Sequence, residues 1–134
     1  MIGNVIQPNG AVSGGGGTQD YSYVVSNVSF TANAWTKIGE YTFPSTGIYA
    51  LGLYPSGGSN NPKASMITYS DVTDPSALGT NDGYLVYAES GTVSCNCSCV
   101  KNCVVNTKIN LFVKSNTTAT NSVRVVVTRL ADMA

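Results

Sequence analysis

The sequence predicts an all-β fold, an antiparallel β-sandwich or jelly roll, and three observations support this. Val, Ile, Tyr, Phe and Thr are concentrated in short segments from residue 21 onward. Clusters of Pro, Gly, Asn and Asp separate these segments, as turns separate strands. No segment carries apolar residues at sustained helical spacing, and short strands at regular intervals are typical of sandwiches. The expected strands lie at residues 21–30, 34–43, 47–56, 64–70, 83–89, 106–115 and 122–130.

The chain is expected to hold one domain, a head over residues 21–134, preceded by a flexible linker or N-terminal arm over residues 1–20. At 134 residues the chain is long enough to bury a core of its own. Four consecutive glycines, Gly14–Gly17, lose much backbone entropy in any regular structure. A disordered N-terminus or an expression scar explains these glycines equally well.

Some of the expected strands are apolar on both faces. In residues 48–53, Ile48 and Ala50 point to one side, while Tyr49, Leu51 and Leu53 point to the other. The last expected strand also carries apolar residues on both sides. A sandwich of this size leaves one face of each sheet in water, so apolar outer faces predict contacts between subunits. Scattered apolar surface residues are the simpler alternative.

The charge balance excludes two classes of partner. Seven basic and seven acidic side chains cancel, and charged residues make up only 10% of the chain. No excess of charge therefore attracts nucleic acid or an anionic membrane. The longest apolar run is far too short to span a bilayer, and no leader of the signal-peptide kind is seen.

The chain is not expected to be an enzyme or to hold a cofactor. It has no histidine, which removes the usual general base and the Ser-His and Cys-His nucleophile pairs. A glycosidase needs two carboxyl groups facing one bond, and acidic residues do gather in residues 70–83. However, Asp74 precedes a proline and Asp82 precedes a glycine, which is ordinary turn chemistry.

All four cysteines, Cys95, Cys97, Cys99 and Cys103, lie within nine residues. Neighbouring cysteines on one face of a regular strand are more than about 6 Å apart, too far for a tetrahedral zinc site. A disulfide in a loop, joining Cys95 or Cys97 to Cys103, is geometrically easier. Reduced thiols, a contact between copies at a threefold axis and an all-thiolate metal site remain open.

Two stretches, residues 34–56 and 106–130, carry a pattern seen elsewhere. A Trp-centred strand runs into a Pro–Gly turn and a Gly-x-Tyr strand, here Trp35, Pro44, Gly47 and Tyr49. Near the end, residues 109–113 precede a polar loop over 116–122 and a last strand that closes on Arg129 and Leu130.

This pattern, over about residues 21–132, resembles the trimeric jelly-roll heads at the tips of phage tail fibres and receptor-binding proteins. Those heads are built like tumour-necrosis-factor-like domains, and the cysteine cluster departs from their pattern. The resemblance implies a homotrimer with inner sheets around a threefold axis. It also implies ligand sites in apical loops or between subunits.

Tyrosines that border the expected loops are candidates for ligand contact. A tyrosine ring with neighbouring amide or carboxylate groups suits a sugar, although most tyrosines in a sandwich are core or interface residues. Tyr87 also borders a loop. The ligand-binding candidates are Tyr54, Asn60, Asn61, Tyr69, Asp74, Asn81, Asp82 and Tyr84.

The sequence and the resemblance together predict a non-enzymatic adhesion head that recognises a host cell-surface saccharide. Its expected location is the tip of a virion tail fibre or a similar cell-surface appendage. Its expected partners are further copies of itself and the saccharide, with no nucleic acid and no membrane insertion. The alternative is a purely structural trimerisation or capping head, as on a virion or a bacterial collagen-like surface protein.

Overall fold

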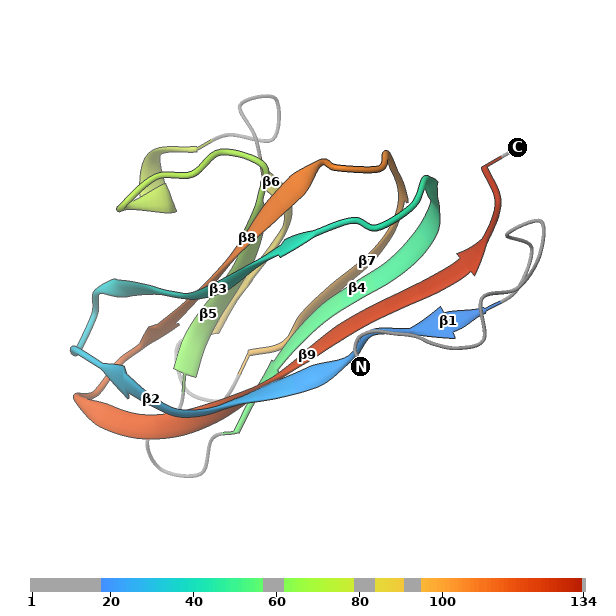
Figure 1. The fold of residues 1–134 in the computed structure, drawn as a ribbon. Helices are drawn as coiled ribbons and strands as arrows, with labels where there is room; N and C mark the ends of the chain where they lie inside the picture. Colours follow the sequence, from blue (N-terminus) through green and yellow to red (C-terminus); the bar gives the residue numbers. More distant parts are fainter. Residues whose placement is uncertain (1–17, 57–61, 79–83, 91–94, 134) are drawn as a thin grey trace.

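The computed structural model describes residues 18–56, 62–78, 84–90 and 95–133. Within these ranges the protein is all-β, with two antiparallel sheets packed as a sandwich (Figure 1). The strands are β1 (Gln19–Asp20), β2 (Tyr23–Phe30), β3 (Trp35–Thr42), β4 (Gly47–Pro55), β5 (Pro62–Thr68), β6 (Tyr84–Glu89), β7 (Cys97–Cys103), β8 (Lys108–Ser115) and β9 (Ala119–Ala131).

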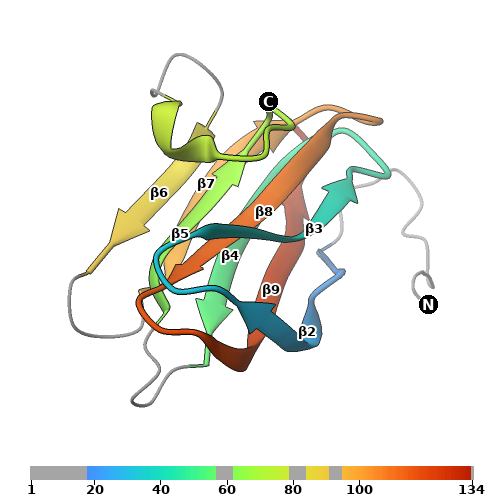
Figure 2. The same ribbon diagram turned by 90° about the vertical axis from the view of Figure 1, so that its left-hand side faces the viewer.

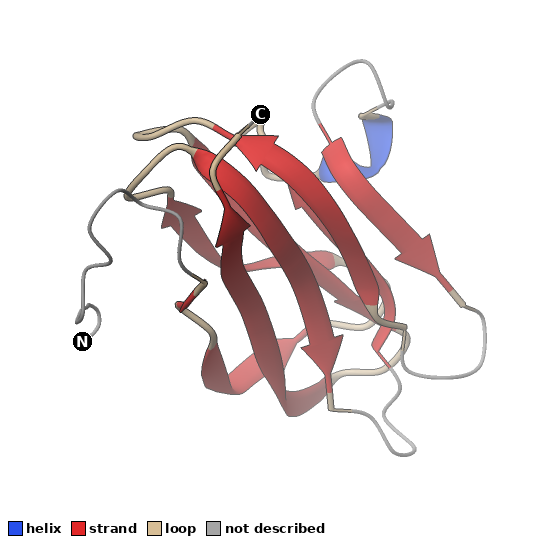
Figure 3. Ribbon diagram, turned by 90° about the vertical axis from the view of Figure 1, so that its right-hand side faces the viewer, coloured by secondary structure: helices blue, strands red, loops and turns tan. Residues whose placement is uncertain are grey.

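The strands interleave between the two sheets as the chain proceeds. In the first, which we call the β9 sheet, β1 and β2 both pair with β9, followed by β4 and then β7. The second, the β8 sheet, has the order β3-β8-β5-β6 (Figure 2). Most strands that follow one another in sequence, such as β2 and β3 or β3 and β4, therefore lie in different sheets, whereas β5 and β6 pair within one sheet. A single turn of 3-10 helix, η2 (Pro75–Ala77), lies beside β6 at the edge of the β8 sheet (Figure 3).

The core lies between the sheets and follows from the period-2 alternation of strands. In β4, Tyr49, Leu51 and Leu53 point inward and are at most 1% exposed, which confirms the face predicted for them. β9 contributes alternate valines, and β8 contributes alternate aliphatic residues. The fully buried members of this core include Phe43, Ile67, Ile109, Leu111, Val113, Val123, Val125 and Val127.

Hydrogen bonds at the Gly-x-Tyr stretch join the turn before β4 to the end of β9. The hydroxyl of Tyr49 donates to the carbonyl oxygen of Ser45 at 2.8 Å. The guanidinium of Arg129, only 3% exposed, donates to the carbonyl oxygen of Thr46 at 2.8 Å and to Asp132 Oδ1 at 2.7 Å. A Cβ atom at Gly47 would lie 2.6 Å from Arg129 Nε. Glycine at this position therefore gives the buried arginine its space.

The structure differs from the sequence prediction at two points. Residues 97–103, expected as part of a cysteine-bearing loop, form strand β7 and pair with β4 along its length. The residues between the cysteines are Ser98, Val100, Lys101 and Asn102, so the segment has only one of the β-branched residues that mark a strand. β1 also lies two residues before the boundary expected between arm and head, because Gln19 and Asp20 pair with β9. Among the residues that the structure describes, there is no helix with the length and apolar character needed to cross a membrane.

Candidate functional site

The predicted ligand residues divide between the two outer faces of the sandwich. Tyr54 lies near the end of β4 on the outer face of the β9 sheet, where its ring covers Gly52. Tyr69 follows β5, and Tyr84 opens β6 and pairs with Thr68. Both therefore belong to the β8 sheet and its connections. The structure thus separates Tyr54 from the other tyrosines.

Half of the predicted set lies outside the described residues, namely Asn60, Asn61, Asn81 and Asp82. Asp74 is described, and it caps η2: its Oδ1 accepts from the backbone N–H of Ser76 at 3.0 Å. Hydrogen bonding to Ser76, through its side chain first and its backbone N–H second, lowers the pKa of Asp74. In the structure Asp74 therefore shapes the turn that carries Ser76 and Leu78.

Cross-strand pairing places a specific set of side chains on the outer face of the β8 sheet. Across the strands, one row runs from Trp35 through Lys114 and Ala64 to Glu89. The adjacent row, on the same face, consists of Lys37, Phe112, Met66 and Tyr87. Met66, Phe112 and Ala64 are at most 2% exposed although they face away from the main core. This outer face is therefore partly covered, and the segment with η2 lies over it.

A hollow of about 180 Å³ opens on this face, and we call it the Trp35 hollow. It lies where the turn with η2 meets the two outer-face rows. Its lining consists of Trp35, Met66, Ser76, Leu78, Tyr84, Tyr87, Glu89 and Lys114. A second hollow of about 500 Å³ borders the other side of Trp35 and reaches Lys37, Asp71 and Thr73. Trp35 is the residue common to both.

Three aromatic rings succeed one another along the Trp35 hollow. The ring centroids of Trp35 and Tyr87 are 6.1 Å apart, and those of Tyr84 and Tyr87 are 6.0 Å apart. Their planes are inclined by 57° and 68°, the tilted arrangement that aromatic pairs prefer. Lys114 Nζ lies 5.1 Å from the centroid of the Trp35 ring, within cation–π range. The rings thus support one another, and the indole is held in place by a cation.

Polar groups accompany these rings. The hydroxyl of Tyr87 donates to Glu89 Oε1 at 2.5 Å. Burial, together with this bond to Glu89, raises the pKa of Tyr87 to about 12, so the phenol stays neutral at physiological pH. The indole Nε1 of Trp35 is buried and has no hydrogen-bond partner among the described residues. A buried donor left without a partner is costly, because its lost bond to water is not replaced.

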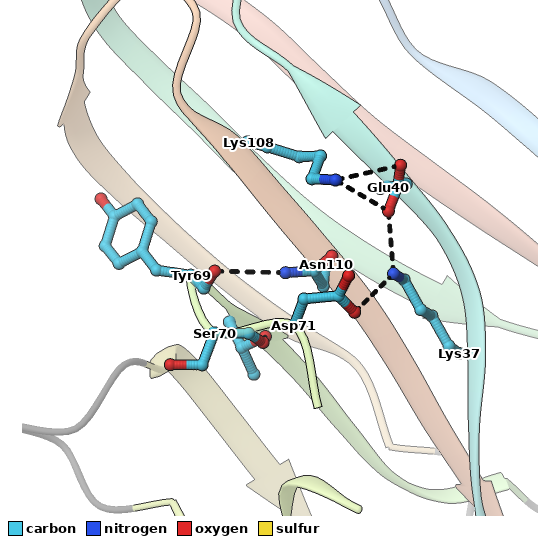
Figure 4. Close-up of polar contacts among 8 residues, drawn as sticks. Lys37, Glu40, Tyr69, Ser70, Asp71, Lys108 and Asn110 are labelled. Atoms are coloured by element: carbon cyan, nitrogen blue, oxygen red, sulfur yellow. Dashed lines mark hydrogen bonds and ion pairs between the residues drawn. The ribbon is translucent and has the colours of Figure 1, made fainter. Parts of the chain in front are cut away.

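An ion-pair network, shown in Figure 4, fastens the chain after β5 across the β8 sheet. Lys37 Nζ lies 2.8 Å from Glu40 Oε2 and 2.8 Å from Asp71 Oδ1. Lys108 Nζ lies 3.3 Å from Glu40 Oε2. The side-chain amide of Asn110 donates to the carbonyl oxygen of Tyr69 at 3.2 Å. These bonds join β3 and β8 to residues 69–71, and so they position the start of the segment that leads to η2.

The same network holds its carboxylates ionised. The hydrogen bond from Lys37 lowers the pKa of Asp71, and the bonds from Lys37 and Lys108 lower the pKa of Glu40. A carboxyl group kept ionised in this way is a poor general acid. The described part of the chain also contains no group of three or more His, Cys, Asp or Glu side chains arranged to hold a metal ion.

Three of the cysteines lie on β7 of the other sheet, whereas Cys95 lies near Tyr87 and Glu89 of the Trp35 hollow. Cys97, Cys99 and Cys103 occupy inward positions of β7, and Cys97 and Cys103 are packed in the core at 3% and 2% exposure. Cys95 precedes the strand, and its carbonyl oxygen accepts from Ser65 Oγ at 2.6 Å. All four thiols are free.

A bridge between Cys97 and Cys103 does not fit strand β7. The two residues are six positions apart, which is about 20 Å along a strand. A disulfide needs Cα atoms roughly 4.4–6.8 Å apart. The disulfide expected from the sequence therefore forms only if strand β7 unfolds locally.

Among the strand residues that line the Trp35 hollow, only Tyr84 was a predicted ligand residue, whereas Trp35, Met66, Tyr87, Glu89 and Lys114 were not. Their common feature is alternation on neighbouring strands, and the registers that align those strands cannot be read from one sequence. Comparison of the sequence with protein-family models and with curated proteins gives no match.

Proposed function

We propose that this protein is a non-enzymatic adhesion head that recognises a surface saccharide on the outer face of the β8 sheet. The observation that carries the proposal is the Trp35 hollow, where three aromatic rings, a carboxylate and an ammonium group meet. Binding sites for small polar ligands combine apolar and aromatic walls with a few convergent polar groups. A sugar ring has an apolar face of C–H groups and an edge of hydroxyl groups, and this lining matches both.

The strand order supports a jelly roll of the tumour-necrosis-factor-like kind. Apart from the short β1, eight strands form two sheets of four, β2-β9-β4-β7 and β3-β8-β5-β6. The chain crosses between the sheets so that early strands pair with late ones, β2 with β9 and β3 with β8. A jelly roll consists of eight strands in two interleaved Greek keys of this form.

The outer face of the β9 sheet supports a homotrimer. Its described side chains are mostly small and apolar or neutral, and Val24 and Val100 are 57% and 60% exposed. Ala50 and Gly52 keep the centre of this face flat. The face consists of Val24, Ile48, Ala50, Gly52, Tyr54, Ser98, Val100, Asn102, Arg124, Val126, Thr128 and Leu130. A low-charge apolar surface of this breadth is typical of a subunit interface.

A trimer would place three copies of the Trp35 hollow on its outside, since the hollow and the β9 face belong to opposite sheets. Several weak sugar sites on one rigid body bind a repetitive surface with an avidity well above that of a single site. This is the arrangement required at the tip of a virion tail fibre or a similar appendage.

The experiment that tests the proposal is a glycan array probed with the purified, labelled protein. We expect binding to a defined group of surface saccharides. A trimer that binds no glycan would instead support the second candidate, a purely structural trimerisation or capping head. The apolar β9 face favours that candidate as much as the first, because it requires only the interface.

We predict no hydrolytic turnover of any glycan that is bound. The chain has no histidine, and Asp71, Asp74 and Glu40 are each committed to a lysine or to a backbone N–H. A reducing-end assay on bound polysaccharide checks this. Release of reducing sugar that disappears in Asp74→Asn or Asp82→Asn would show that the protein is an enzyme.

A further inference from the structure

We infer that the Trp35 hollow takes one neutral hexopyranose unit, with its C–H face on the aromatic rings and its hydroxyl groups toward Glu89 and Lys114. This inference rests on the proposed function and names the site and the class of sugar. Trp35, Glu89 and Lys114 were not ligand candidates in the sequence, and only the strand pairing of the structure brings them together with Tyr87.

The aromatic rings form an apolar wall of the Trp35 hollow. Trp35, Tyr87 and Tyr84 form a continuous series at centroid spacings of about 6 Å. The face of an aromatic ring carries partial negative charge, and it attracts C–H groups that carry partial positive charge. Leu78 and Met66 close the remaining apolar wall. A pyranose ring in its chair form can present a face of C–H groups, and this wall suits such a face.

The polar half comes from Glu89 and Lys114, which flank the small residue Ala64 on neighbouring strands. Glu89 Oε1 accepts a hydrogen bond from the hydroxyl group of Tyr87. A carboxylate has further lone pairs that can accept from the hydroxyl groups of a ligand. The ammonium group of Lys114 only donates hydrogen bonds. Sugar hydroxyls both donate and accept, so one ligand can satisfy groups of both kinds.

The charge of the lining decides the class of sugar. One carboxylate and one ammonium group line the hollow, so it has no net charge. An acidic sugar would gain from Lys114 but would meet Glu89, and burying like charges together is costly. An amino sugar would meet Lys114 in the same way. A neutral hexopyranose avoids both conflicts.

The size of the hollow limits the ligand to about one ring. Pockets for drug-sized ligands have volumes of roughly 300–1,000 Å³, whereas the Trp35 hollow has about 180 Å³. A single ring bound in so small a site binds weakly. The affinity of the intact head must therefore come from several copies acting together.

Trp35 is the only tryptophan in the chain, so tryptophan emission reports on the two hollows that share this residue. The experiment titrates the full chain with methyl glycosides of galactose, glucose, mannose and N-acetylneuraminic acid. We expect a saturable change in tryptophan emission with at least one neutral glycoside and none with the sialoside. A response to the sialoside alone would show that the class of sugar is wrong.

Glu89→Gln and Lys114→Gln are the test variants, and Tyr54→Ala on the β9 face is the matched control. Loss of a charged hydrogen-bond partner should weaken binding of the neutral glycoside about tenfold or more. Tyr54→Ala should leave binding to the monomeric glycoside unchanged. Circular dichroism of each variant, matching that of the parent, shows that the fold is intact.

Trp35→Ala on the glycan array separates this inference from the proposed function. Array binding that survives in Trp35→Ala, with no emission change in the parent, would overturn the site while the adhesion function stands. An array without any glycan binding would overturn the proposed function itself. Loss of array binding in Trp35→Ala with retained fold supports both.

Discussion

Two strand glycines show how individual residues are fitted to this fold. Gly47, at the start of β4, faces the buried guanidinium of Arg129, and a Cβ atom there would lie 2.9 Å from the carbonyl oxygen of Ala131. Gly39, in β3, has nothing within 4 Å of the position where its Cβ would lie. The two positions look alike in the sequence, and only the packing around them distinguishes them.

We predict that Gly47→Ala lowers the free energy of unfolding by about 1–3 kcal/mol, because Arg129 is held by two hydrogen bonds and cannot move away. Gly39→Ala is the control, and it should be neutral or stabilise by up to about 1 kcal/mol, since alanine has less backbone freedom to lose. Urea unfolding of both variants measures the difference. Equal stabilities would contradict the close contact at Gly47.

The thiols give a second prediction for single residues. Burial raises the pKa of Cys97 to about 12 and that of Cys103 to about 11. Since the thiolate is the reactive form, both should resist alkylation at about pH 8 in the folded protein. Cys95, outside the strand and partly exposed, should react first. Intact-mass analysis after iodoacetamide treatment, with and without urea, follows each thiol.

In urea without reductant, all four cysteines should be alkylated if the thiols are free. Two or four cysteines that stay unmodified until a reductant is added would establish the disulfide expected from the sequence. One equivalent of zinc or iron per chain in elemental analysis would establish a metal site instead.

At the scale of strands, the sequence predicted the fold better than it predicted the site. All seven expected strands are present, because Val, Ile and Tyr at period 2 mark them clearly. β7 was missed, since its inward positions hold three cysteines and Lys101, and its outward positions are Ser98, Val100 and Asn102. The Trp35 hollow was missed apart from Tyr84, because it depends on which strands are neighbours and in which register. Those facts come from long-range pairing such as that of Trp35 with Lys114.

The connection between β5 and η2 gives a prediction about pH. The pKa values of Asp71 and Glu40 are lowered by hydrogen bonds from lysines, from ordinary values of 3.8 and 4.5. A group whose folded pKa is lowered stabilises the fold above its ordinary pKa, and this contribution is lost as the pH falls through the folded value. Residues 69–71 should therefore detach from β3 at pH values below the ordinary pKa values of Asp71 and Glu40.

Backbone NMR shifts of residues 69–74 between about pH 6 and pH 3 measure this loosening. In Lys37→Met the same residues should already be displaced at neutral pH and should respond less to acid. Lys101→Met, on β7 of the other sheet, is the matched control and should behave like the parent. Identical titrations in all three proteins would show that the network does not hold the segment.

At the scale of the whole molecule, the two outer faces differ in character. The β9 face is flat, apolar and weakly charged, whereas the β8 face carries the ion-pair network and the aromatic hollow. A monomer would expose both. In the proposed trimer, the β9 face is buried around a threefold axis and the β8 face points outward.

We predict that Val100→Lys converts the trimer to folded monomer, because three lysines would be brought together in a surface without counter-charges. Val105→Lys is the control: it is also an exposed valine, at 41% against 60%, but it lies in the turn between β7 and β8. Sedimentation equilibrium of both variants gives the masses. A parent protein that sediments only as monomer at micromolar concentration would rule out the trimer.

The central claim is that this protein holds a saccharide over Trp35 on the outer face of the β8 sheet. A crystal structure of the protein grown with the neutral glycoside that gives the strongest tryptophan response tests it most directly. We expect electron density for one pyranose ring against Trp35, Tyr84 and Tyr87, with its hydroxyl groups within hydrogen-bonding distance of Glu89 and Lys114. Density for the sugar on the β9 face beside Tyr54, with the Trp35 hollow empty, would contradict it.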